Sequence, residues 1–307
     1  MTMSKLSSLL FLAAPALPTL LAACADDGAG LPADPPSSVT LVAWGGFTAP
    51  TDAVSSPDGA TFYFAARDGQ GQPAIFSVSS EPGSTAHARQ AGAPLAGPTG
   101  LVMSCDGATL YVADPSGVYS MPAAGGALTA VAVGGVDHAT GLAMASDCTT
   151  LYATGRTTDD QPALFSFPTT GGIARIVHMG QPLVEPSGMF IDDLNVAWVM
   201  DALAAGQDGP GVLFAIPSDG STATPVMSNL HMGSPGGVSL TAGGGTAVIP
   251  TRDVSNKTQL TTVKIATGAV VNVPAPDILA PAGIRVARGA GVFAVVDAAG
   301  DAIYRAD

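Results

Sequence analysis

The chain has 307 residues, of which 47% are hydrophobic and only 11% are charged, and it contains 38 glycines and 25 prolines. So many turn-forming residues exclude a protein built of long helices, and the apolar share excludes a disordered chain. The formal net charge of −13 repels nucleic acid and anionic lipid headgroups, which excludes both as partners.

The first residues have the pattern of a secretory signal. Lys5 supplies one positive charge, an apolar stretch covers 6–21, and polarity rises at Asp26 and Asp27. A charged start, a short apolar run and small residues before a cleavage site are typical of a signal peptide. The apolar run is short and broken by prolines, so it does not predict a membrane span.

The sequence Leu21-Ala22-Ala23-Cys24 resembles the lipobox of bacterial lipoproteins. In that family the signal peptide is cut before the cysteine, whose sulfur then carries the lipid. The resemblance implies a signal peptide over 1–23 and a lipid anchor on Cys24; the alternative is an ordinary secretory signal with an incidental cysteine. Several acyl chains, at about 0.8 kcal/mol per buried CH2, hold a protein stably at a membrane.

The anchor predicts a place in the bacterial cell envelope. Ala25, and not Asp, follows the cysteine, which resembles lipoproteins of the outer membrane where a cell has two membranes. With one membrane, the prediction is the outer face of the plasma membrane. Residues 24–38 are small, acidic and rich in proline, and are expected to form a flexible, lipidated tether.

A repeat occupies the rest of the chain, 39–307. The clearest copy is PTGLVMSCDGATLYVAD at 98–114, and related segments align on six anchor residues spaced 41 to 49 residues apart. Periods of this length, with several strands each, indicate the blades of a β-propeller. The anchors are Asp52, Gly100, Gly141, Gly188, Gly237 and Gly283.

Each repeat predicts four antiparallel strands. An apolar strand follows the anchor, and an Asp-Gly pair such as Asp106-Gly107 supplies the positive φ of a tight hairpin. A second strand returns, a third is expected over 117–121, and a fourth over 128–133. The predicted fold is therefore an all-β, six-bladed propeller.

The two ends of the chain are expected to close the ring. The sixth repeat stops after its third strand, and the strand-like segment VTLVAW at 39–44 precedes the first repeat. Pairing of this segment with Ala302, Ile303 and Tyr304 would complete the last blade and cover an exposed sheet edge.

The repeat, with its G-x-x-x-S-x-D-G-x-x-L-Y-V-A-D pattern, resembles the propeller repeats of the NHL, YVTN and SMP-30/gluconolactonase-like families. The resemblance covers nearly the whole segment 39–307. It implies an architecture that hosts binding modules and enzymes alike, so the fold does not choose between these functions.

Two cysteines remain after Cys24. Cys105 and Cys148 lie near the first hairpins of neighbouring repeats, and an oxidising compartment favours a disulfide. Their offset by two positions in the repeat leaves two alternatives, a bridge and two separate thiols, because a bridge needs Cα atoms within about 7 Å.

The SMP-30/gluconolactonase-like resemblance implies a metal-dependent lactone or ester hydrolase, with a divalent cation such as calcium on the channel axis. In those enzymes Glu, Asn and Asp hold the metal, and two of them directly precede the anchor glycine. Here the equivalent positions carry Thr51, Thr99, Thr140, Ser187, Gly236 and Ala282. The nearest carboxylates are Asp52, Glu185 and, after a second strand, Asp201.

Two further groups of polar residues mark one face of the disc. Asp114, Asp201 and Asp297 each close a second strand, where an aspartate commonly bonds backbone amides of a turn. His138, His178 and His231 precede first strands of their repeats; they form either a loop site at this face or solvated side chains.

Two functions follow from these patterns. The preferred interpretation is a monomeric binding module without a cofactor, which takes a protein or small-molecule ligand at a propeller face. Its candidate loops are the inserts at 157–161, 202–210 and 253–257. The alternative is the metal-dependent hydrolase, with Asp52, Glu185 and Asp201 as ligands of a divalent cation.

Overall fold

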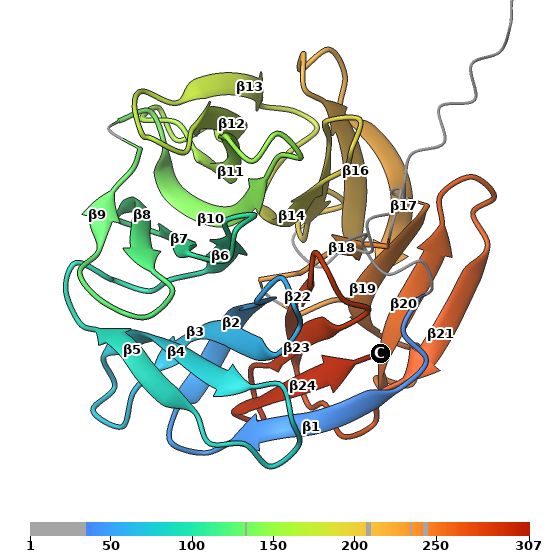
Figure 1. Ribbon diagram of the computed structural model, residues 1–307. Helices are drawn as coiled ribbons and strands as arrows, with labels where there is room; N and C mark the ends of the chain where they lie inside the picture. Colours follow the sequence, from blue (N-terminus) through green and yellow to red (C-terminus); the bar gives the residue numbers. More distant parts are fainter. Residues whose placement is uncertain (1–34, 133, 207–209, 234, 242–244) are drawn as a thin grey trace, which may run out of the picture.

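Six four-stranded antiparallel sheets are arranged in a ring around a central axis (Figure 1). The computed structural model describes residues 35–307, except 133, 207–209, 234 and 242–244. The predicted signal peptide, Cys24 and most of the predicted tether lie outside the described residues. The prediction of six blades with four strands each is confirmed.

Within the described residues, no helix has the length and apolar character that crossing a membrane requires.

In blades 1 to 5 the strands follow chain order outward from the axis (Figure 1). Blade 1 contains β2 (Thr48–Ser55), β3 (Thr61–Arg67), β4 (Pro73–Ser79) and β5 (His87–Ala91). Blade 2 contains β6 (Gly100–Met103), β7 (Thr109–Asp114), β8 (Gly117–Pro122) and β9 (Thr129–Ala130). Blade 3 contains β10 (Asp137–Met144), β11 (Thr150–Arg156), β12 (Pro162–Pro168) and β13 (Arg175–Met179).

The second half of the ring repeats this order and ends with a strand from the start of the chain. Blade 4 contains β14 (Pro186–Ile191), β15 (Val196–Asp201), β16 (Gly211–Pro217) and β17 (Thr224–Leu230). Blade 5 contains β18 (Ser239–Leu240), β19 (Thr246–Arg252), β20 (Thr258–Lys264) and β21 (Val270–Pro274). Blade 6 contains β22 (Pro281–Val286), β23 (Phe293–Asp297), β24 (Ala302–Ala306) and β1 (Val39–Trp44).

The ring closes as the sequence predicts. β1 pairs antiparallel with β24, with Ala43 opposite Ile303 and Trp44 opposite Ala302. The backbone N–H of Ser38 also donates to the carbonyl of Asp307 (2.9 Å). The two ends of the described chain therefore lie side by side at the rim of blade 6 (Figure 1).

The first hairpins form through the expected Asp-Gly chemistry. In blade 2, Ser104 donates to Asp106 (2.6 Å), the carboxylate accepts the N–H of Ala108 (3.0 Å), and Gly107 has a φ of 72°. The hydroxyl of Ser104 holds the pKa of Asp106 below its usual value. Cys148 takes the place of this glycine in blade 3, with a φ of 58°.

The outer strand of blade 2 is shorter than expected. β9 covers only Thr129 and Ala130. The following residues turn toward the neighbouring blade, because Ala132 forms a parallel bridge to Gly172 and Val131 accepts the N–H of the same glycine (3.0 Å).

The anchor glycines explain how the inner strands fit around the axis. A Cβ on Gly100, Gly141, Gly188, Gly237 or Gly283 would approach the neighbouring blade closer than 3.0 Å. Only glycine allows such an approach of one backbone to another. The sixth anchor, Asp52, carries a side chain, and its carboxylate lies against Gly283.

The hydrophobic core consists of clusters between adjacent blades. In the cluster that joins blades 1 and 6, Phe64 and Phe76 stack with ring centroids 5.2 Å apart, and Phe47 packs edge-on against Phe64. These buried aromatic side chains hold the first and last blades together.

Candidate functional site

Each inner strand begins at one face of the disc and ends at the other. We call the face at which β2, β6, β10, β14, β18 and β22 begin the start face. The opposite face carries the hairpins between first and second strands, and we call it the hairpin face. The candidate residues from the sequence belong to the start face or to the axis just below it.

Asp52 lies on the axis and is almost fully buried. Its Oδ2 accepts the N–H of Leu101 (2.9 Å) and lies 3.6 Å from Nη2 of Arg285. Burial raises the pKa of the carboxyl, and the neighbouring guanidinium offsets only part of that effect. Asp52 thus links the inner strands of blades 1, 2 and 6.

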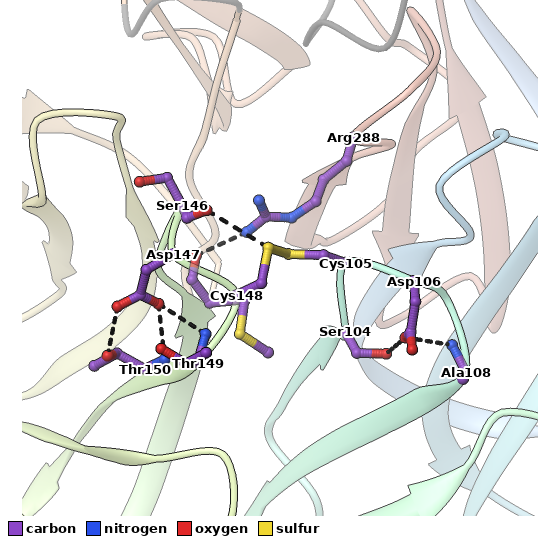
Figure 2. Close-up of a disulfide and its surroundings, with 11 residues drawn as sticks. Ser104, Cys105, Asp106, Ala108, Ser146, Asp147, Cys148, Thr149, Thr150 and Arg288 are labelled. Carbon is purple, nitrogen blue, oxygen red and sulfur yellow. Dashed lines mark hydrogen bonds between the residues drawn. A yellow bond between two sulfur atoms is a disulfide. The ribbon is translucent and has the colours of Figure 1, made fainter.

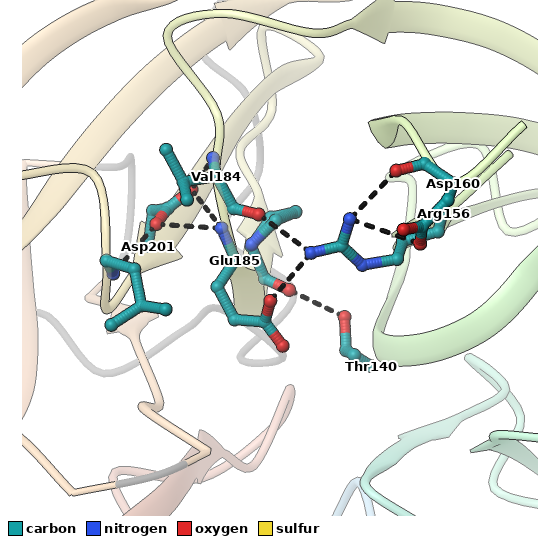
Figure 3. Close-up of polar contacts among 8 residues, drawn as sticks. Thr140, Arg156, Asp160, Val184, Glu185 and Asp201 are labelled. Atoms are coloured by element: carbon teal, nitrogen blue, oxygen red, sulfur yellow. Dashed lines mark hydrogen bonds and ion pairs between the residues drawn. The ribbon is translucent and has the colours of Figure 1, made fainter. Parts of the chain in front are cut away.

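The carboxylates of Asp201 and Glu185 both bind groups of the protein itself (Figure 3). Asp201 is fully buried and accepts the backbone N–H groups of Val184 (2.7 Å), Glu185 (3.1 Å) and Leu203 (3.0 Å). The Glu185 side chain forms an ion pair with Arg156, with 2.8 Å between Oε2 and Nη2.

These three carboxylates do not form a metal cage. Among the residues that the structure describes, no three His, Cys, Asp or Glu side chains gather as they would around a metal ion. A calcium ion needs six to eight oxygen ligands. The carboxylate oxygens of Asp52, Glu185 and Asp201 instead accept hydrogen bonds from backbone amides and guanidinium groups. The residues present therefore do not fit the divalent cation that the hydrolase alternative requires.

The aspartates that close second strands anchor loops. Asp114 accepts the N–H groups of Ala96, Gly97 and Ser116. Asp297 accepts those of Leu279 and Ala280 before its own inner strand, both at 2.8 Å. The interpretation of these residues as turn-forming is confirmed. Each one ties the segment that enters an inner strand to the end of the next strand.

Four of the six positions before the anchors hold hydroxyl groups that join neighbouring blades. Each hydroxyl donates to a backbone carbonyl at the start of the following blade. The bonds run from Thr51 to Pro98 (2.7 Å), Thr99 to Ala139 (3.0 Å), Thr140 to Pro186 (2.7 Å) and Ser187 to Gly236 (3.2 Å). These residues are not the Glu, Asn or Asp that a metal site would need at these positions. Their hydroxyl groups instead connect neighbouring blades near the axis.

The three histidines lie in different surroundings. His138 is exposed, and its ring lies 3.8 Å from Asp137. His178 belongs to the outer strand β13, where its Nδ1 lies 3.4 Å from the carbonyl of Gly220 and its buried Nε2 has no hydrogen-bond partner. His231 lines a separate hollow of about 360 Å³ beside Arg252 and blade 5. The structure does not bring them into one site.

His138 and Glu185 instead share a cleft of about 260 Å³ on the start face, between blades 2, 3 and 4. Its lining is Thr99, Pro115, His138, Ala139, Thr140, Gly155, Arg156, Asp160, Glu185 and Pro186.

Arg156 organises the cleft. It sits at the end of β11 and reaches across to blade 4, where its Nη2 contacts Glu185 and donates to the carbonyl of Val184 (3.1 Å). Its Nη1 donates to the carbonyl of Asp160 (2.9 Å), as Figure 3 shows. The bond to Glu185 raises the pKa of the guanidinium.

The cleft offers both charges and hydrogen-bonding groups in a small space. One guanidinium, two carboxylates and the imidazole of His138 face a volume that a polar small molecule or a protruding side chain can fill. Sequence reasoning identified His138, Glu185 and the loop 157–161, but it missed Arg156. The one available signal was its position directly before that insert.

Comparisons with known proteins identify the architecture. No protein-family model matches the chain, and no curated protein matches it in sequence.

Solved structures do match, among them three with low sequence identity to this chain. A structural genomics protein of unknown function from Bacteroides thetaiotaomicron has a TM-score of 0.63 and 14% identity, over 90% of this chain and 74% of that one. A chain of a nidogen/laminin complex has a TM-score of 0.60 and 17% identity, over 77% and 85%. TolB from Acinetobacter baumannii has a TM-score of 0.58 and 13% identity, over 74% of this chain and 54% of TolB. At these identities the likeness shows the propeller fold alone.

Proposed function

We propose that this chain is a lipid-anchored β-propeller of the bacterial cell envelope that binds a ligand in the cleft around Arg156. The main support for this proposal is the set of contacts that the candidate carboxylates make. Asp52 and Asp201 are held by backbone amides and an arginine, so they serve the scaffold, whereas the ion pair of Arg156 and Glu185 faces an open cleft of about 260 Å³.

The scaffold supports a binding role. Loops on a rigid framework are the usual place of recognition, and here hydroxyl bonds near the axis and buried aspartates fix the loops that surround the cleft. The likeness to a chain from a nidogen/laminin complex adds that a propeller of this kind occurs in a protein–protein complex. The lipobox at Cys24 supports the anchor and hence the envelope.

The anchor is tested by following the protein in fractionated cells. With Cys24→Ala we expect the mature chain to move from the membrane to the soluble fraction, and the intact mass to lose the increment of the acyl chains. If Cys24→Ala changes neither the intact mass nor the fraction in which the chain is found, the anchor is wrong, and the cleft is not affected.

The cleft is tested by site-specific photocrosslinking on the full-length chain in its host cells. A crosslinker at His138, whose side chain is 67% exposed, should give a discrete product. The matched control is Leu194, 84% exposed on the hairpin face, which should not give it. Arg156→Gln should reduce the product at position 138, because it removes the group that organises the cleft. Equal products at both positions would contradict the proposal.

The hydrolase alternative is tested on the same purified chain. A stoichiometric divalent ion, lost together with lactone or ester hydrolysis on Glu185→Gln, would replace the binding proposal with the enzyme.

A further inference from the structure

A second cavity lies at the opposite end of the axis, on the hairpin face. It has a volume of about 40 Å³, is partly open to solvent, and is lined mainly by the ends of the inner strands of five blades, β2, β6, β10, β14 and β22. Nothing in the proposed function uses it, because the cleft around Arg156 belongs to the start face.

The walls of this axial cavity are apolar except for two arginines and two serines. Met103, Met144 and Phe190 supply much of the apolar surface, while Arg285 and Arg288 supply two guanidinium groups. The whole chain has only 11 Lys and Arg residues and a net charge of −13. Two arginines in one small cavity therefore stand out from the charge of the molecule.

Arg285 has unused hydrogen-bonding capacity. Only 5% of the residue is exposed. One terminal nitrogen donates to the carbonyl of Met189, the other lies 3.6 Å from Asp52, and the buried Nε has no partner. A distance of 3.6 Å is too long for a good hydrogen bond, and a buried donor without an acceptor carries the cost of its lost hydration.

Arg288 approaches from the loop after β22. Its Nη2 donates to the carbonyl of Met144 (2.8 Å), and Figure 2 shows it beside the Cys105–Cys148 disulfide. Burial lowers the pKa of this guanidinium, and the negative charge of Asp193, which is itself exposed, offsets part of the effect. An anion bound beside Arg288 would therefore stabilise the charged form of its guanidinium.

The charge and the volume of the cavity limit which ligands can bind in it. Arg285 and Arg288 bring two positive charges to a cavity whose lining, among the described residues, contains no carboxylate, and Asp52 lies beside Arg285 only, so the cavity favours an anion. Since one water needs about 10–15 Å³ of such volume, the cavity of about 40 Å³ holds a group of only a few non-hydrogen atoms. Apolar walls favour an anion with an aliphatic part over a strongly hydrated dianion.

We propose that the axial cavity binds a small aliphatic monocarboxylate. Its oxygens accept from the guanidinium groups of Arg285 and Arg288, and its short aliphatic part contacts Met103, Met144 and Phe190. Charge-assisted bonds from guanidinium to carboxylate are the strong ones in proteins.

The test uses the full-length chain in a non-ionic detergent, with propionate as probe and propionamide as its neutral analogue. Calorimetry should show saturable binding of one propionate, with propionamide at least about tenfold weaker. Arg288→Gln should weaken propionate about tenfold or more, because it removes a charge-assisted bond. Arg288→Lys, which keeps the charge, should lie between. The matched control is Arg67→Gln, an exposed arginine of blade 1, which should bind as the unaltered chain does.

A second readout places the ligand. With 13C-labelled methionine methyl groups, propionate should shift the signals of Met103 and Met144 and leave that of Met179, which is exposed on β13. The proposal is wrong if propionate does not bind saturably, if propionamide binds equally well, if Arg288→Gln changes nothing, or if the two cavity methionines do not shift. None of these outcomes bears on the cleft of the start face.

Discussion

Cys148 occupies the turn position that glycine holds in the hairpins of blades 1 and 2. A positive φ is sterically unfavourable for a residue with a Cβ, and Cys148 has one. Its side chain forms a disulfide with Cys105, which connects blade 3 to blade 2 (Figure 2). The Cα atoms lie 5.8 Å apart. Of the two alternatives that the sequence left open, the structure has the bridge.

Two substitutions at Cys148 separate the bridge from the backbone. Cys148→Ser loses the disulfide, which closes a segment with a sequence separation of 43 residues, and should lower the free energy of unfolding by about 3–4 kcal/mol. Cys148→Gly loses the same bridge but accepts the positive φ, so it should be about 1 kcal/mol more stable than the serine variant. Chemical denaturation of both variants measures the difference.

The control for this pair is Cys105→Ser, which removes the bridge from its other end. It should match Cys148→Ser. A glycine variant no more stable than the serine variant would show that the turn is not under steric cost at position 148.

Asp52 should give the protein a characteristic pH dependence. Because the folded-state pKa lies above the ordinary value of 3.8, the folded state keeps a proton that the unfolded state has released. This contribution to stability therefore falls as the pH rises above about 4. Asp52→Asn lacks it, so the Tm of the variant relative to the unaltered chain should increase from pH 4 to pH 7.

Asp106 supplies a control with the opposite sign. Its folded-state pKa lies below 3.8, so its contribution is present above that pH and is lost as the pH falls. The relative Tm of Asp106→Asn should therefore decrease as the pH rises. If Asp52→Asn followed the same direction as Asp106→Asn, the attraction of Arg285 would outweigh burial at Asp52.

Strand β1 has both exposed and buried positions, and a comparison of the two tests the closure of the ring. Val42 is fully buried with Phe47 and Phe62, whereas Thr40 is exposed on the same strand. Val42→Asp places a charge in this core and should cost more than about 3 kcal/mol. Thr40→Asp should change stability by no more than about 0.5 kcal/mol. Thermal unfolding gives both values.

Limited proteolysis shows whether the loss is local to the closure. In Val42→Asp the end of the chain after β23 should become the first site of cleavage, because β24 loses its partner β1. Cleavage that begins elsewhere in the ring would contradict the role given to β1.

The strands nearest the axis were the most predictable elements. Their Asp-Gly turns require a positive φ and their anchor glycines allow neighbouring blades to approach closely, and both features leave a clear trace in the sequence. The outer strands were less predictable, because they are short and exposed and their ends depend on the next blade. β9 shows this, since Ala132 pairs with Gly172 of blade 3.

For the whole molecule, the sequence predicted the six blades and the closing strand but not the cleft. Arg156 and Glu185 lie 29 residues apart on different blades, and their meeting depends on the ring geometry, which no local pattern contains. The anchor glycines are a second example. The repeat shows that glycine recurs, but its cause, the contact of neighbouring backbones at the axis, is visible only in three dimensions.

The pairing of β1 with β24 also sets an order of events for folding. Residues 39–44 are synthesised before every blade, whereas their partner residues are among the last of the chain. Contacts between residues so far apart in sequence form slowly, because the intervening chain must first be brought together. Blade 6 can therefore complete only after the final residues arrive. Until then residues 39–44 lack their partner strand, and unpaired strand edges are the parts of a folding chain most prone to aggregate.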